Sequence, residues 1–254
     1  MIRVENVTAT VEGRTILDNV SFHVRAGETK VMLGPSGAGK SSLLKIILGL
    51  WRPDSGSVRI GGVNITEMSE REQLTVRRRM SMVFQGNALF DSLTVEENVG
   101  YFLSEHHDMP EAELARRVAH CLDFVNLRNT QEMLPEEVSG GMKKRVAIAR
   151  AIAFDPEILL YDEPTTGLDP VNAKTVTGLI MKLQQERKVT SVVVTHILRD
   201  AFAVADSLAL IHEGKIVFDG SSQELMNSDN QFVRHFLAEI REEAGVSMNH
   251  LTQK

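Results

Sequence analysis

Residues 29–50, TKVMLGPSGAGKSSLLKIILGL, decide the fold of this chain. The run opens with apolar residues typical of a buried strand and closes with apolar residues at helical spacing. Between them lies the pattern G-x-x-x-x-G-K-[ST], at Gly34, Gly39, Lys40 and Ser41. Glycines let backbone N–H groups surround a phosphate, the lysine reaches its terminal oxygens, and the serine hydroxyl can ligate Mg²⁺. The stretch therefore predicts a strand, a phosphate-binding loop and a helix.

Two further apolar runs end in residues suited to phosphate chemistry. ILLYDE ends in Asp162 and Glu163, and these carboxylates can hold a magnesium shell and polarise an attacking water. SVVVTH ends in His196, whose neutral imidazole can hydrogen-bond a γ-phosphate or the water. Taken alone, the carboxylates also fit a solvated strand end, and the histidine fits a structural or surface role. The phosphate-binding loop in the same chain favours the functional interpretation.

A second stretch, VSGGMKKR at 138–145, also has the character of an anion site. A serine and two glycines precede a basic helix, and a helix N-terminus presents unpaired N–H groups and partial positive charge. One nucleotide-binding domain would then carry two phosphate-facing helix starts, far apart in sequence.

The rest of the chain alternates between strands and helices, which implies a parallel sheet covered on both faces. We predict an α/β fold, a P-loop NTPase (RecA-like) core. Short strands and turns before the phosphate-binding loop form an N-terminal antiparallel β subdomain, and a helical subdomain is inserted at about 87–153. The nucleotide-binding domain is expected over 1–236, followed by a helical or flexible tail at 237–254.

The composition of the chain argues against several classes of function. Lys and Arg number 28 against 34 Asp and Glu, a net charge of −6, which argues against binding nucleic acid through bulk charge. No apolar run approaches the ~20 residues that cross a bilayer, so we expect a soluble, cytosolic protein. The single cysteine, Cys121, lies in an apparent helix and is read as a small buried hydrophobe.

The order and spacing of these motifs resemble the nucleotide-binding subunits of ABC transporters. The resemblance rests on the phosphate-binding loop, Gln85 after SMVF, VSGGM, ILLYDEP, GLDP at 167–170 and His196, and it extends to about residue 220. In that family two copies pair head to tail, so that the VSGGM signature of one chain covers the ATP held by the other. The resemblance thus implies an ATPase that binds ATP and Mg²⁺ between two copies of itself and drives an integral-membrane permease.

The resemblance also assigns roles to individual residues. Glu163, His196 and Gln85 would be catalytic, and Ser41, Gln85 and Asp162 would hold the metal. ATP would contact Gly34, Pro35, Ser36, Gly37, Ala38, Gly39, Lys40, Ser41 and Ser42 in one chain. From the partner chain it would contact Ser139, Gly140 and Gly141, while Asp169 would connect the two sites.

The chain departs from the usual family pattern at two places. Met142 stands where the signature most often has Gln, which removes an amide but keeps the serine and glycines. Val11 stands near where an aromatic usually stacks on adenine, and Arg14 is an alternative cover for the base.

Within the family, residues 75–99 and the SGGM signature resemble the Mla-type phospholipid-transport ATPases that serve MCE systems. The resemblance implies lipid trafficking between inner and outer membranes, and a place on the cytoplasmic face of the inner membrane. Its implied partners are an MlaE-like permease, an MCE-domain protein and a small STAS-domain protein, with no nucleic acid. NALF at 87–90 offers apolar groups for permease docking, or plain packing beneath the helical insert. The alternatives are a transporter ATPase for another small substrate, such as an amino acid or a metal, and a soluble ABC ATPase acting on nucleic acid or the ribosome.

Overall fold

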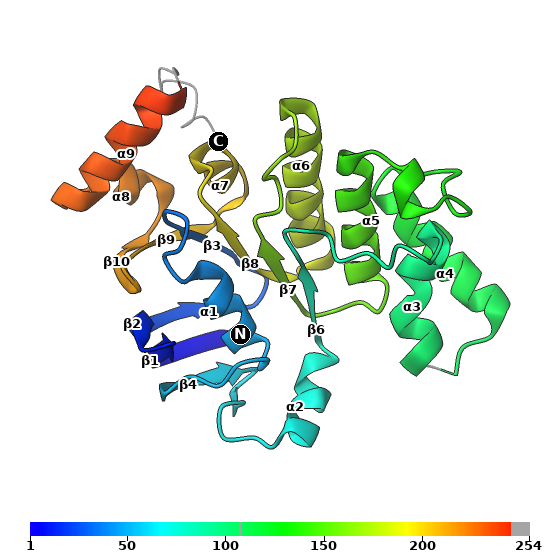
Figure 1. The fold of residues 1–254 in the computed structure, drawn as a ribbon, viewed down its shortest axis with the longest axis horizontal. Coiled ribbons are helices and arrows are strands. Elements are labelled where there is room, and N and C mark those ends of the chain that lie inside the picture. Colours follow the sequence, from blue (N-terminus) through cyan, green and yellow to red (C-terminus); the bar gives the residue numbers. More distant parts are fainter. Residues whose placement is uncertain (107, 245–254) are drawn as a thin grey trace.

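The computed structural model describes residues 1–106 and 108–244 of the chain (Figure 1). Its centre is a six-stranded sheet in the order β10-β9-β3-β8-β7-β6. The strands from β9 to β6 are parallel, and β10 pairs antiparallel with β9 at one edge. The strands are β3 (Thr29–Leu33), β6 (Met80–Val83), β7 (Ile158–Asp162), β8 (Thr190–Thr195), β9 (Ser207–His212) and β10 (Lys215–Gly220).

A second, antiparallel sheet has the order β2-β1-β4-β5, with two strands from before the phosphate-binding loop and two from after α1. Its strands are β1 (Ile2–Val11), β2 (Arg14–Val24), β4 (Ser55–Ile60) and β5 (Val63–Asn64). Side chains of β2 alternate between buried and exposed over its second half, as expected of a sheet with one face on a core.

The two faces of the parallel sheet belong to two different hydrophobic clusters. In β3, Val31 and Leu33 pack into one cluster and Met32 into the other, because neighbouring residues of a strand point to opposite faces. One cluster holds α1 (Lys40–Ile47) and the antiparallel sheet. The other holds α6 (Pro170–Arg187), α7 (Leu198–Val204) and the inserted helices. This arrangement confirms the predicted α/β fold.

The segment predicted as a helical insertion contains three α-helices and one turn of 3-10 helix. These are α3 (Val95–His106), α4 (Glu111–Phe124), η1 (Pro135–Glu137) and α5 (Gly140–Ile152). Their apolar residues share one cluster with α6 and α7, so the insertion packs against the main domain along α5. Figure 1 shows these helices on the side of α6 away from α1.

One helix occurs where the sequence patterns predict none. The charged stretch before β6 forms α2 (Glu70–Arg77), which begins with a capping box in which Ser69 and Glu72 bond each other's backbone N–H groups. Beyond α8 (Ser222–Met226), α9 spans Gln231–Ala244, so the expected boundary after residue 236 falls inside a helix. The rest of the predicted tail, residues 245–254, lies outside the described residues. No helix among the described residues has both the length and the apolar character to cross a bilayer.

Candidate nucleotide-binding site

The phosphate-binding loop runs from the end of β3 to the start of α1, where Gly39 is the N-cap residue. Gly39 has φ 94°, a conformation that favours glycine, and a Cβ there would lie 2.5 Å from the Ile16 carbonyl oxygen. A Cβ on Gly34 would lie 2.3 Å from the Ile211 carbonyl oxygen. The loop therefore passes so close to β2 and β9 that only glycine fits at either end. Pro35 to Gly37 are exposed at its tip, Ala38 is buried, and Ser42 is half-buried in α1.

Lys40 lies over this loop with its side chain only 6% exposed. Its ammonium donates hydrogen bonds to the carbonyl oxygens of Gly34 at 2.9 Å and Pro35 at 3.0 Å. It also lies 3.6 Å from Oε1 of Glu163. Burial lowers the pKa of Lys40, and the nearby Glu163 carboxylate opposes that decrease. The ammonium is thus held at the loop by two hydrogen bonds to carbonyl oxygens and one longer ion pair.

Ser41 and Asp162 meet at the carboxyl end of the sheet. The Ser41 hydroxyl donates a hydrogen bond to Oδ1 of Asp162 at 2.8 Å. Burial raises the pKa of Asp162, while the bond from Ser41 and the charge of Lys40 oppose the increase. A hydroxyl and a carboxylate are the hard oxygen donors that Mg²⁺ takes beside substrate phosphates. The donor set fits that metal.

Glu163 is held by three side chains from separate parts of the chain. Its Oε2 accepts a hydrogen bond from the Thr166 hydroxyl at 2.9 Å and lies 3.0 Å from Nδ1 of His196. Its Oε1 faces Lys40. The backbone at Glu163 has φ 47°, an uncommon conformation for a non-glycine residue, and its N–H bonds the Val194 carbonyl. The carboxylate is therefore buried and oriented at the end of β7.

Gln85 lies two residues after β6 and is exposed. Since Val83 pairs with Tyr161 in the parallel register of β6 and β7, Gln85 comes level with Glu163. Its backbone carbonyl accepts a hydrogen bond at 2.9 Å from Lys144, a buried residue of α5. Burial lowers the pKa of Lys144 to about 8, and the Asp162 carboxylate opposes the decrease.

The signature residues form the start of α5. Ser139 is the N-cap, and its hydroxyl oxygen accepts a hydrogen bond from the Met142 N–H at 3.3 Å. A Cβ added to Gly141 would lie 2.3 Å from Oδ1 of Asn172. Asn172 in turn donates a 2.5 Å hydrogen bond to Asp169, the N-cap residue of α6. The structure therefore brings the signature and GLDP together within one chain.

The two helix starts face different parts of the molecule. Among the described residues, no hydrogen bond joins the phosphate-binding loop to Ser139, Gly140 or Gly141. Figure 1 shows α1 and α5 on either side of α6. Within one chain the phosphate-binding loop and the signature are thus separate helix starts with no hydrogen bond between them in the described residues. Val11 and Arg14, the residues weighed as adenine contacts, are both exposed near the turn between β1 and β2.

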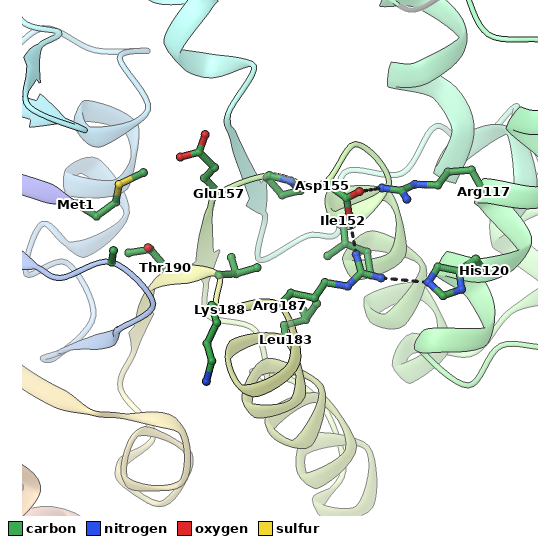
Figure 2. Close-up of a pocket in the computed structure, with 13 residues that line it drawn as sticks. Met1, Arg117, His120, Ile152, Asp155, Glu157, Leu183, Arg187, Lys188 and Thr190 are labelled. Carbon is green, nitrogen blue, oxygen red and sulfur yellow. Dashed lines mark hydrogen bonds and ion pairs between the residues drawn. The ribbon is translucent and has the colours of Figure 1, made fainter.

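A separate cavity of about 610 Å³ lies at the opposite edge of the sheet, where β7 and β8 begin. Figure 2 shows Arg117 and Arg187 converging on Asp155, with His120 beside Arg187. The carboxylate bonds both guanidinium groups, so Arg117 and Arg187 already have an anionic partner. We interpret these ion pairs as a structural connection between α4, α6 and the turn before β7.

Three residues of the site were missed in the sequence: Thr166, Asn172 and Lys144. Thr166 had a signal, because a threonine in the turn after a strand carboxylate can reach back to it. Asn172 and Lys144 act across elements distant in sequence, and no local pattern marks such contacts.

Comparisons with known proteins agree with this geometry. The family model described as ABC transporter matches residues 17–166. The intermembrane phospholipid transport system ATP-binding protein MlaF of Haemophilus influenzae is 38% identical over 93% of this chain and 90% of that protein. The probable ribonucleotide transport ATP-binding protein mkl of Mycobacterium leprae is 38% identical over 93% of this chain and 68% of that protein. The dimeric post-hydrolysis structure of the ATP-binding cassette MJ0796, bound to ADP and Pi, aligns with a TM-score of 0.81 and 33% identity over 87% of this chain and 98% of that one.

The phosphate-binding loop, the strand-end carboxylates and the signature helix thus occur together in a chain that matches this family over most of its length. The chain belongs to the ABC transporter family, as an ATP-hydrolysing subunit.

Proposed function

We propose that the chain works as a head-to-tail homodimer in which the signature of each copy covers the ATP held by the other. The observation that carries this proposal is the separation of the two helix starts within one chain. A signature that cannot reach its own phosphate-binding loop still presents free N–H groups to a neighbour. Val171, 76% exposed beside Asp169, gives the same surface an apolar residue for a second copy to cover.

The residues around the phosphate-binding loop have separate roles in phosphoryl transfer. The loop and Lys40 hold the phosphates, and Ser41, Asp162 and Gln85 hold Mg²⁺, which supplies charge neutralisation when bound. Lys40 can exchange its contact with Oε1 of Glu163 for phosphate oxygens. That oxygen is then free to polarise the attacking water, while Thr166 and His196 keep the other oxygen fixed.

We further propose that the ATPase drives a permease that moves phospholipid. The relative named for intermembrane phospholipid transport and the residues at 75–99 support this cargo. Docking is assigned to the segment after Gln85, where Phe90 is 42% exposed and lies 4.5 Å, centroid to centroid, from the ring of Tyr101. Such an assembly places the chain on the cytoplasmic face of the inner membrane, with an MlaE-like permease, an MCE-domain protein and a STAS-domain protein as partners.

The cargo is tested by isolating the native complex and identifying bound proteins and lipids by mass spectrometry. Phospholipid beside a permease and an MCE-domain protein supports the proposal. Recovery of a different permease with ribonucleotide, amino acid or metal as its cargo would overturn the lipid assignment while leaving the ATPase intact.

The catalytic roles are tested by Glu163→Gln. Removing the negative charge keeps the shape of the site but leaves no base, so the rate of hydrolysis should fall at least ~100-fold. ATP binding should persist, and the variant should accumulate as an ATP-bound dimer, measured by light scattering after size-exclusion chromatography. Lys40→Ala is the control, because on its own it should not hold ATP tightly and so should not accumulate as an ATP-bound dimer. Normal turnover by Glu163→Gln contradicts the assignment of Glu163 as the base.

A further inference from the structure

A buried lysine of the signature helix, α5, is hydrogen-bonded to the loop at residues 84–88, which we call the Gln85 loop. The Lys144 ammonium donates hydrogen bonds to the carbonyl oxygens of Phe84 at 3.1 Å and Gln85 at 2.9 Å. Lys144 is only 2% exposed, and it lies about one turn beyond the signature glycines on α5. Burying a lysine costs free energy, so the contacts it makes there need a reason beyond plain packing.

A second cation on the same helix holds the next part of the loop. The guanidinium of Arg150 donates hydrogen bonds to the carbonyl oxygens of Asn87 at 2.8 Å and Ala88 at 2.6 Å. Both loop residues have positive φ, 64° and 50°, a conformation that costs free energy outside glycine and persists when its surroundings hold it. The shape of the loop after Gln85 therefore depends on α5.

We propose that Lys144 and Arg150 are positioning residues that tie Gln85 to the signature helix of the same chain. This inference rests on the proposed role of Gln85 at the metal and the attacking water. Ser139 caps α5, so the signature and the two cations belong to one rigid helix. The position of Gln85 in its site therefore depends on the helix that carries the signature.

The helix also provides a matched control. Arg145 donates hydrogen bonds to the carbonyl oxygens of Val125 at 3.3 Å and Asn126 at 2.8 Å. The contact has the same chemistry as that of Lys144 and comes from the adjacent residue. It holds the end of α4 instead of the Gln85 loop.

The test compares Lys144→Met, Arg145→Met, Gln85→Ala and the double variant Lys144→Met/Gln85→Ala in the full chain. We measure kcat and KM for ATP, and binding of a fluorescent ATP analogue. Lys144→Met should lower kcat about tenfold, because small misplacements of a reacting group are costly, and should leave KM and analogue affinity within about twofold. Arg145→Met should keep kcat within about twofold of the unaltered chain. The double variant should be no slower than Gln85→Ala alone, since both changes remove the same contribution.

The results distinguish failure of the proposed role of Lys144 from failure of the proposed role of Gln85. If Gln85→Ala slows hydrolysis but Lys144→Met does not, or if the two effects add, the tie is overturned and the role of Gln85 stands. If Gln85→Ala turns over normally, the role of Gln85 is overturned and the tie with it. Should Lys144→Met fold poorly, Arg150→Met, which changes a half-buried residue, gives the same comparison.

Discussion

At the scale of single residues, the site is defined by close approaches that leave no room for a side chain. Gly34 and Gly39 bring the phosphate-binding loop against backbone carbonyls, and Gly141 brings the signature against Asn172. Gly140, its neighbour, has open space where a Cβ would stand. Two adjacent glycines in the signature thus differ: packing within the chain requires glycine at position 141 but not at position 140, where the proposed dimer would bring a partner's phosphate close.

This difference predicts opposite effects on stability. Gly141→Ala should destabilise the protein by about 1–3 kcal/mol, since Asn172 must move and its bond to Asp169 is disturbed. Gly140→Ala should leave stability unchanged or raise it by about 0.5 kcal/mol, because alanine favours a helix over glycine. Thermal unfolding of the two purified variants checks this. Equal melting temperatures would show that Asn172 does not restrict position 141.

Among the helices and strands, apolar patterns predict the buried ones and fail for a helix of low apolar content and for contacts between elements distant in sequence. The apolar runs of β3, β7 and β8 and the helix after Gly39 follow directly from the sequence. The helix α2 was read as a charged stretch because it has little apolar character, although SERE at 69–72 carries its capping box. The contacts of Lys144 with the Gln85 loop could not be predicted, since α5 and β6 become neighbours only in the folded chain.

The junction of α4, α6 and the turn before β7 gives a prediction at this scale. Asp155→Asn removes the anion that both Arg117 and Arg187 bond, yet asparagine tolerates the positive φ of 54° found there. We expect a loss of about 0.5–1 kcal/mol, since the groups are partly exposed to solvent. Differential scanning calorimetry should show this as a melting temperature lowered by about 2–3 °C.

The control for this junction is Asp123→Asn. Asp123 pairs with Arg128 on an open surface, with side chains 53% and 80% exposed. Its removal should leave the melting temperature unchanged. If Asp155→Asn also leaves the melting temperature unchanged, the ion pairs of Asp155 drawn in Figure 2 do not stabilise the junction of these elements.

At the scale of the whole molecule, the sequence motifs predicted the fold class and brought Lys40, Ser41, Asp162, Glu163 and His196 into one site. They could do so because each follows a strand of the same parallel sheet, and the carboxyl ends of such strands meet at one edge. The tie between Gly141 and GLDP through Asn172 could not be predicted, because it depends on how α5 packs against α6. Under the proposed head-to-tail pairing a complete site needs two chains, because the signature of one chain lies apart from its own phosphate-binding loop.

Mixing two inactive variants tests whether a site is built from two chains. Lys40→Ala disables the phosphate-binding loop, while Ser139→Asp keeps a good N-cap for α5 but sets a carboxylate against the partner's phosphate. A mixed dimer holds one site with both defects and one site with neither. ATP hydrolysis should therefore appear on mixing, at up to about a quarter of the unaltered rate, since half of randomly paired dimers are mixed and each has one intact site of two. A mixture as inactive as its components, or a Ser139→Asp chain active alone, would contradict the composite site.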